Sequence, residues 1–373
     1  MKGTIHPLLQ GNFIIDMENR KSEYLAIGAM SGTSLDGLDL SLCRYFFCNG
    51  QWDFELIDCS FVEYSPEMRL KLKGAYSALA RVLVETDIEF GRYIGQQVKK
   101  FAQKNKFTPD LVASHGQTIF HSPSEGYTCQ IGSGAVVASI TGLPVVSDFR
   151  QQDVTLGGQG APLVPIGDML LFAKYGACLN IGGFANISYN SNNKRVAFDI
   201  CAVNFVLNRL ASLAGKDFDK DGEMASFGLP DKNLLAELSQ IAYYGLVPPK
   251  SLGQEWADKH VLPMLERYSN IPLQNLLHTY TVHAAAEISK TFVGFVGETV
   301  LVTGGGAKNK YLVQKIQEYT CKQIIVPESQ ITDFKEAIIF GFLGVLRLRG
   351  DVNCISSVTG AHKDTSAGAL YLP

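Results

Sequence analysis

Three glycine-rich turns, each next to an apolar run, constrain the fold of this chain more than any other feature. They are GAMSGTSLDG at 28–37, NIGGFANIS at 180–188 and VTGGGAKN at 302–309. The first two lie between short apolar or alternating runs and predict hairpins, whereas the third leads from a strand into a helix. An ordinary tight hairpin explains either of the first two when it is taken alone. Small residues also let backbone N–H groups approach phosphate oxygens, and a helix N-terminus favours anions.

Patterns elsewhere in the chain predict a mixture of strands and helices. Strands are expected at 24–29, 38–42, 111–114, 144–147, 177–181, 185–189, 195–198, 299–303 and 323–326. Helices are expected at 66–84, 87–106, 204–214 and 308–320, within 231–295, and from near residue 334 onward. Two blocks that each begin with a hairpin and continue into helices predict a duplicated α/β architecture. The polar, glycine-rich stretch 151–160 is the expected break between them.

Composition excludes several classes of protein. The chain has 373 residues, which predicts about two domains. Its 33 Lys+Arg and 36 Asp+Glu nearly balance, so we expect no nucleic-acid partner. Eight cysteines without a C-x-x-C pair indicate reduced thiols in a cytoplasmic protein. The most apolar stretch, 337–346, is too short to span a bilayer, so we expect no membrane association.

The order of the three turns resembles the sugar kinase, Hsp70 and actin superfamily, in which two related domains clamp a nucleotide. From about residue 24 onward the chain is similar to the anhydro-N-acetylmuramic acid kinases of bacterial cell-wall recycling. The matching stretches are 30–37, 114–118, 148–150, 153 with 157–165, 180–188, 219–221, 303–309 and 357–361. The resemblance implies an α/β, two-domain actin-like ATPase fold with an interdomain cleft, and a homodimer.

We therefore divide the chain into three parts. Residues 1–22 form an N-terminal extension, and 23–150 an N-terminal α/β domain with the first phosphate loop. Residues 151–373 form a C-terminal α/β domain with the second phosphate loop and the adenosine loop.

The same resemblance implies a chemistry. The family opens the 1,6-anhydro bridge of anhydro-N-acetylmuramic acid with water and phosphorylates O6 from ATP, giving N-acetylmuramic acid 6-phosphate and ADP. Phosphoryl transfer needs positioning and charge neutralisation. Ring opening also needs a general base, because water is a poor nucleophile at neutral pH.

The turns supply the expected nucleotide contacts. They are Ser31, Gly32, Thr33, Ser34, Asp36, Gly37, Gly182, Gly183, Asn186, Gly304, Gly305, Gly306 and Asn309. Asp36 is also the candidate ligand of Mg²⁺, directly or through water, because hard cations prefer oxygen. A dinucleotide fold or a P-loop is disfavoured, because neither G-x-G-x-x-G nor G-x-x-x-x-G-K-[ST] occurs.

The resemblance makes Asp199 the candidate general base. The family motif is Asp-Thr-Gly-Pro-Gly/Ala-Asn, and this chain has DICAVN at 199–204, which keeps the aspartate and the asparagine. The alternative is that Asp199 only caps the helix that follows. We expect Val203 to add bulk beside the sugar and so to shift preference among anhydro sugars. Cys201 is expected to be a packed thiol and no nucleophile.

The candidate sugar contacts come from several parts of the chain. They are His115, Asp148, Arg150, Asp153, Asn204 and Glu336. The planar guanidinium of Arg150 suits the lactyl carboxylate of a muramyl sugar, although an internal Arg–Asp ion pair is an equal alternative. Glu336 opens the predicted last helix, so attraction to the helix dipole is the alternative to a sugar contact. His115 either lines the cleft or is structural.

Other functions fit the sequence less well. A catalytically weakened relative could bind a muropeptide-derived sugar as a sensor, and the altered residues after Asp199 favour that reading. Retention of Asp199, Asp36 and all three turns argues against it. An Hsp70-like chaperone would need a β-rich peptide-binding domain after the nucleotide domain. A regulator would need a helix-turn-helix arm, for which 1–22 is too short.

Overall fold

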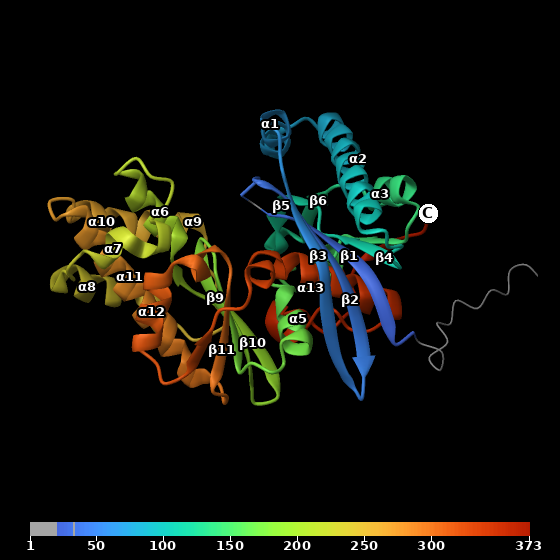
Figure 1. The fold of residues 1–373 in the computed structure, drawn as a ribbon. Coiled ribbons are helices and arrows are strands. Elements are labelled where there is room, and N and C mark those ends of the chain that lie inside the picture. Colours follow the sequence, from blue (N-terminus) through green and yellow to red (C-terminus); the bar gives the residue numbers. More distant parts are fainter. Residues whose placement is uncertain (1–20, 33) are drawn as a thin grey trace, which may run out of the picture.

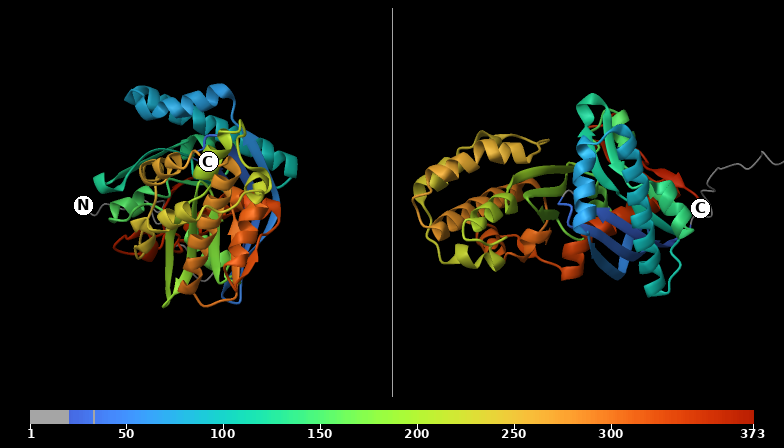
Figure 2. Two further views of the ribbon diagram at one scale, coloured as in Figure 1. Left: turned by 90° about the vertical axis from the view of Figure 1, so that its left-hand side faces the viewer. Right: turned by 90° about the horizontal axis from the view of Figure 1, so that it is seen from above.

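The structure is a computed structural model that describes residues 21–32 and 34–373 (Figure 1). Most of the predicted N-terminal extension, residues 1–20, lies outside the described residues, and so does Thr33 of the first turn. The described chain forms two lobes, each built around one sheet, and the right-hand view of Figure 2 shows the same two lobes from above.

The first lobe contains a six-stranded sheet with the order β13-β7-β4-β1-β2-β3. Its strands are β1 (Glu23–Ser31), β2 (Gly37–Cys48), β3 (Gln51–Glu63), β4 (Leu111–Ser114), β7 (Val145–Ser147) and β13 (Ala369–Tyr371). Strands β1, β2 and β3 are antiparallel neighbours, whereas β1, β4 and β7 run parallel. A separate hairpin pairs β5 (Gln117–Ser122) with β6 (Tyr127–Ile131).

The second lobe repeats this topology in a five-stranded sheet with the order β10-β9-β8-β11-β12. Its strands are β8 (Ala177–Ile181), β9 (Phe184–Ser191), β10 (Lys194–Ala202), β11 (Thr299–Thr303) and β12 (Gln323–Ile325). Again three antiparallel strands are followed by strands parallel to the first of them. Both halves therefore add their strands in the same spatial order, which confirms the duplicated α/β architecture.

Helices cover the sheets and fill the space between the lobes. In the first half they are α1 (Pro66–Gly74), α2 (Ala80–Asn105), α3 (Gly134–Thr141), α4 (Gln151–Thr155) and α5 (Val164–Leu171). The second half has α6 (Asn204–Ser212), α7 (Glu223–Ser226), α8 (Lys232–Ser239), α9 (Gln254–His260), α10 (Leu262–Arg267), α11 (Leu273–Lys290), α12 (Lys310–Glu318), α13 (Ser329–Arg349) and α14 (Ser356–Thr359). No helix in the part of the chain that the structure describes is long and apolar enough to cross a membrane.

Helix α13 lies at the centre of the molecule. It packs on β1, β2 and β4 of the first sheet and also contacts α5 and β11 (Figure 1). Its run Ala337–Leu346 is almost fully buried in an apolar core that includes Leu111 of the first lobe and Leu301 of the second. A second core lies between the first sheet and α2, and a third between the second sheet and α11. Burial on all sides explains why this helix is apolar around its whole circumference.

The C-terminal part of the chain belongs with the first sheet. Strand β13 pairs antiparallel with β7 through Leu370 and Val146, and α13 covers the inner face of the same sheet. The predicted C-terminal domain, 151–373, includes both elements, so the chain crosses back after the second lobe. For the residues before α13, the predicted domain boundary near residue 150 stays a prediction.

Local structure agrees with the predicted strands and differs elsewhere. Helices α3, α4 and α5 and strands β6 and β13 were not predicted. The predicted break between the first two helices was 85–86, but α1 ends at Gly74 and α2 already begins at Ala80. Thr86 and Asp87 lie inside α2, where the Thr86 hydroxyl donates to the Val82 carbonyl and the Asp87 carboxylate accepts from Gly132 N–H. Strand β3 was not predicted. Helix α13 begins at Ser329 instead of near residue 334.

Candidate active site

A row of polar side chains crosses the second sheet at one level. The strand registers pair Asp199 of β10 with Asn186 of β9, Asn186 with Asn180 of β8, and Asn180 with Thr303 of β11. Residues directly opposite each other in a sheet point to the same face. The predicted base and the predicted Asn186 contact therefore lie in one row that ends at the third glycine turn.

This row faces the first lobe. Side chains two residues apart on a strand share a face, so Asn180 shares one with Cys178, which packs in the α13 core. Asn186 shares its face with Ser188, whose hydroxyl donates to Asp168 of α5. The opposite face, with Leu179 and Ile187, packs in the core against α11. The carboxylate of Asp199 is consequently on the side of the sheet that looks toward the other lobe.

Asp199 is half-buried and held on several sides. Its Oδ2 atom accepts a hydrogen bond of 2.8 Å from Leu252 N–H. Burial raises the pKa of the Asp199 carboxyl, and the Leu252 hydrogen bond opposes that rise. It does not cap α6, because Val203 occupies the N-cap position and accepts no bond through its side chain. The capping alternative is therefore wrong.

The second and third glycine turns lie against each other. The carbonyl oxygens of Gly182 and Gly183 accept from Asn204 N–H and Val203 N–H, which joins the second turn to the start of α6. Gly304, at φ +83°, leaves only 2.8 Å between a hypothetical Cβ and the Ile181 carbonyl oxygen, so no side chain fits there. Gly305 is exposed and its nearest neighbour is the Asn204 amide. Asn204 thus lies beside the third glycine turn.

The third turn continues into α12 through Asn309. The Asn309 side chain caps that helix by accepting from Leu312 N–H at 2.9 Å. Gly222, next to the matching stretch 219–221, lies directly against the Asn309 amide. Asn309 therefore has a structural role in the described chain, and its nucleotide contact stays a prediction.

Helix α13 brings the third turn close to the first lobe. Gly304 N–H donates to the Thr332 carbonyl, and Lys308 forms an ion pair with Asp333 at 2.7 Å. Asp333 and Glu336 in turn are close enough to Asp39 of β2 to raise the pKa of its carboxyl. The start of α13 thus lies between the first and the third glycine turns.

The first turn is organised around Ser31 and Asp36. The Ser31 hydroxyl accepts from the Tyr64 phenol at 2.7 Å and donates to Gln117 at 2.5 Å. Asp36 is exposed and accepts from the Ser34 hydroxyl at 2.7 Å. Burial, followed by Asp36 and the α13 carboxylates, raises the pKa of Asp39 to about 7. Gly32 and Gly37 complete the described part of this turn.

These oxygens fit a magnesium ion held partly by phosphates. Asp36 offers an exposed carboxylate, and burial together with the nearby Asp36, Glu336 and Asp333 charges raises the pKa of Asp39. Among the described residues no group of three or more His, Cys, Asp or Glu side chains could form a complete metal cage. Magnesium usually binds through one or two carboxylates together with substrate phosphates and water, so a sparse protein contribution suits it.

His115 and Arg150 form a hydrogen-bonded pair next to the first turn. Arg150 donates from Nε and Nη2 to His115 Nε2 at 3.0 and 2.9 Å, and from Nη1 to the Gly160 carbonyl at 2.7 Å. Burial, followed by the Arg150 charge, lowers the pKa of His115 to about 3, so its imidazole is neutral and Nε2 accepts. Burial lowers the pKa of Arg150 to about 10, so the guanidinium stays charged at neutral pH. No Asp or Glu among residues 21–32 and 34–373 forms an ion pair with Arg150, so the internal Arg–Asp alternative is wrong.

Glu336 faces the same region from α13. Its side chain is solvent exposed, yet surrounding protein raises the pKa of the carboxyl and the Arg150 charge opposes that rise. Because α13 begins seven residues earlier at Ser329, Glu336 lies in the helix interior. The first-turn dipole alternative is therefore wrong, and a ligand contact stays a prediction.

Two groups of predicted residues lie away from an open site. Asp153 is fully buried, and its carboxylate accepts from Gly160 N–H and the Thr359 hydroxyl, both at 2.7 Å. Those bonds fix the loop before α5 to the C-terminal segment, so a direct sugar contact is not supported.

Val203 and Cys201 are also fully buried, in the α11-side core. The expected crowding of the sugar by Val203 is therefore wrong. Asp148 is exposed, with a left-handed φ of 56°.

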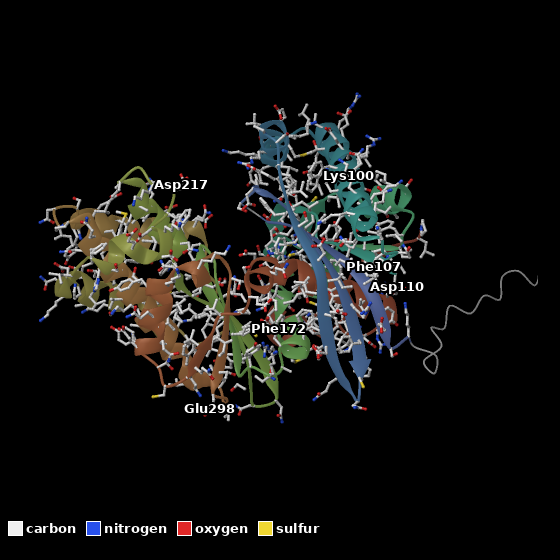
Figure 3. All side chains as sticks on the ribbon, in the orientation of Figure 1. Lys100, Phe107, Asp110, Phe172, Asp217 and Glu298 are labelled. Atoms are coloured by element: carbon white, nitrogen blue, oxygen red, sulfur yellow. The ribbon has the colours of Figure 1, made fainter. Side chains whose placement is uncertain are left out.

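The sequence did not reveal a buried charged cluster where the lobes meet. Asp168 of α5 pairs with Lys335 of α13 at 2.6 Å and lies 3.9 Å from Arg195 of β10. All three side chains are at most 6% exposed. Phe172, labelled in Figure 3 at the junction of the lobes, lies under the Lys335 ammonium. A lysine just before a long apolar helical run is the local signal that could have suggested a buried partner.

The repeated sheet topology, with glycine turns that approach each other across α13, defines a two-lobed protein of the actin-like ATPase fold. The family described as anhydro-N-acetylmuramic acid kinase matches residues 24–373. Anhydro-N-acetylmuramic acid kinases of Francisella tularensis subsp. novicida and Pseudomonas putida are each 33% identical to the chain. The alignments cover 94% and 93% of this chain and 99% of each relative. The chain belongs to the anhydro-N-acetylmuramic acid kinase family.

Two solved structures show a more distant likeness to the chain. Component A of (R)-2-hydroxyglutaryl-CoA dehydratase from Acidaminococcus fermentans is 11% identical with a TM-score of 0.44, covering 86% of this chain and 97% of that one. A ROK family glucokinase from Streptomyces griseus is 12% identical with a TM-score of 0.40, covering 86% and 99%. Similarity at this level has no bearing on the substrate of this chain.

Proposed function

We propose that this chain is an ATP-dependent kinase that opens the 1,6-anhydro ring of anhydro-N-acetylmuramic acid with water and phosphorylates O6. The products are N-acetylmuramic acid 6-phosphate and ADP, in a cytoplasmic step of peptidoglycan recycling. The observation that carries the proposal is the placement of Asp199. Its carboxylate lies on the face that looks toward the first lobe, in the row that runs through Asn186 and Asn180 to the third glycine turn.

The geometry at Asp199 suits a general base. Oδ2 is held by Leu252 N–H, which leaves Oδ1 to accept a proton from water. A carboxylate whose conjugate acid has a raised pKa is a stronger base than an ordinary aspartate. Water attacking the anomeric carbon loses its proton to Oδ1 as the bond from that carbon to O6 breaks. O6 then accepts the terminal phosphoryl group of ATP.

The nucleotide contacts follow from the turns. Backbone N–H groups of the first and second turns, around Gly32 and Gly183, would bind phosphate oxygens, and the third turn at Gly305 would lie against the adenosine. Mg²⁺, bound near Asp36, would neutralise phosphate charge during transfer. Arg150, charged and placed by His115, is the candidate partner of the lactyl carboxylate.

The proposal is tested by coupled ADP-release kinetics with anhydro-N-acetylmuramic acid, together with identification of the phosphorylated product. The wild-type enzyme should release one ADP for each N-acetylmuramic acid 6-phosphate formed. Asp199→Asn removes the base while keeping size, so we expect kcat to fall roughly 10²–10⁴-fold. ATP affinity should change little, because Asp199 is separated from the exposed glycines of the third turn by two strands.

Two outcomes would overturn parts of the proposal. Near-normal turnover of Asp199→Asn would remove this residue from the base role. Binding of the sugar by the wild-type protein without ADP release would favour the sensor. The buried positions of Cys201 and Val203 weaken the sensor reading, because the altered residues of the motif lie inside the core.

A further inference from the structure

A short segment after α8 holds Asp199 from three directions. We call Tyr243, Lys250 and Leu252 the brace. The Tyr243 phenol donates to the Asp199 carbonyl at 2.7 Å, Asp199 N–H donates to the Lys250 carbonyl at 3.2 Å, and Leu252 N–H donates to Asp199 Oδ2 at 2.8 Å. Both backbone polar groups of Asp199 and one carboxylate oxygen therefore depend on one segment.

The brace acts where the sheet is interrupted. The register of β10 against β9 shifts between Asp199 and Cys201, which is a β-bulge. A bulge disrupts the ladder locally, so the paired strands set the face of the sheet on which Asp199 lies but not the exact direction of its carboxylate. The bonds from the brace supply the missing constraint at this position.

Packing beneath the brace is incomplete, which makes its hydrogen bonds more important. A cavity of about 170 Å³ lies between the segment, β10 and α11. Its lining includes Phe198, Tyr244, Leu246, Pro248, Lys250 and Glu287. The Lys250 ammonium sits 4.6 Å from the Tyr243 ring centroid and donates to the Tyr243 carbonyl at 3.2 Å. The Tyr243 ring also packs against Trp256 at 5.2 Å between ring centroids, so both polar and aromatic contacts anchor the brace.

We infer that Tyr243 is a positioning residue for the reaction: its phenol fixes the backbone of Asp199 so that Leu252 N–H holds Oδ2 and Oδ1 points at the attacking water. This inference rests on the proposed function, because it requires Asp199 to be the base. Tyr243 itself is buried and its hydroxyl is bonded to a carbonyl, so it does not touch the sugar.

The chain provides a matched control at the next position. Tyr244 has the same side chain and lines the same cavity, but its hydroxyl contacts His283 Nε2 at 3.2 Å and not Asp199. Tyr243→Phe and Tyr244→Phe therefore remove the same atom from adjacent residues. The ionisable groups around them are Asp199, Lys250, Cys201, His283 and Glu287.

The experiment compares both variants with wild type and with Asp199→Asn in the full-length enzyme. We expect Tyr243→Phe to lower kcat about 3- to 10-fold, the effect of one hydrogen bond, with KM for sugar and for ATP changed less than twofold. The acidic limb of the kcat profile should move to higher pH, because a weakened Leu252 bond no longer favours the ionised carboxylate. Tyr244→Phe should keep wild-type kcat and an unmoved profile.

The outcomes separate this inference from the proposed function. If Asp199→Asn abolishes turnover but Tyr243→Phe matches wild type in kcat and in pH profile, the positioning role is wrong and the base stands. If Tyr243→Phe and Tyr244→Phe lose equal activity together with melting temperature, the effect is general destabilisation and the inference is wrong. If Asp199→Asn keeps its activity, Asp199 is not the base, and the proposed function is wrong before the role of Tyr243 comes into question.

Discussion

At the scale of the single residue, the pKa of Asp39 makes the stability of the folded protein depend on pH. Burial and the neighbouring Asp36, Glu336 and Asp333 raise the pKa of its carboxyl to about 7, whereas an unfolded chain has a value near 3.8. The folded protein therefore binds a proton that the unfolded chain releases between these values. Stability from this residue is present below about pH 4 and is lost as the pH rises to about 7.

We expect Asp39→Asn to remove this dependence. The variant should gain melting temperature relative to wild type as the pH rises from 4 to 7.5, and the gain should level off above that. Thermal unfolding at half-unit pH steps checks this, with the exposed Asp53→Asn as control. A constant difference between variant and wild type across this range would contradict the assignment.

At the scale of the element, the closest approach is between β1 and α13. A Cβ placed on Gly28 would overlap the Ala337 carbonyl oxygen, so the strand and the helix meet backbone to backbone. We expect Gly28→Ala to destabilise the fold by about 1–3 kcal/mol or more, because neither backbone can move away inside the core. Chemical denaturation measures the loss.

Gly74→Ala is the matched control for that change. Gly74 has a helical φ of −70° and no neighbour within 4 Å of the added methyl. It should be neutral or slightly stabilising, since alanine restricts the unfolded chain. Equal loss in both variants would mean that the β1–α13 contact is not as close as described.

The elements also show what the sequence could reveal. Apolar runs beside glycine turns predicted strands well, because a buried strand appears in the sequence as a run of apolar residues. The strand predicted at 299–303 agrees residue for residue with Thr299–Thr303 of the structure. Strand β3 was missed although Trp52, Phe54 and Leu56 alternate with polar residues, which is the local pattern of a half-exposed strand. The row through Asp199 could not be predicted from local patterns, because it depends on the registers of four strands. The brace could not be predicted either, because its loop lies about fifty residues from Asp199 in the sequence.

At the scale of the whole molecule, the buried pair Asp168–Lys335 joins elements that lie between the lobes. Burial alone would lower the pKa of Lys335, but Asp168 raises it above the ordinary value, so the lysine is charged. Lys335→Met would leave Asp168 buried with only the more distant Arg195 as a cation. We expect a loss of about 3–5 kcal/mol in the free energy of unfolding.

A surface pair provides the control for that loss. Lys71 and Glu89 are 2.5 Å apart but about half exposed, so Lys71→Met should cost at most about 1 kcal/mol. Urea denaturation of both variants gives the comparison. Similar small losses would show that the interlobe pair contributes little to the fold.

The return of α13 and β13 to the first sheet also affects how the chain is made. Domains usually fold in order as they leave the ribosome, the N-terminal one first. Here the strands synthesised first remain without their central helix and their edge strand until Ser329–Arg349 and Ala369–Tyr371 have been translated. The apolar inner face of the nascent first lobe must therefore stay protected until α13 and β13 have been translated.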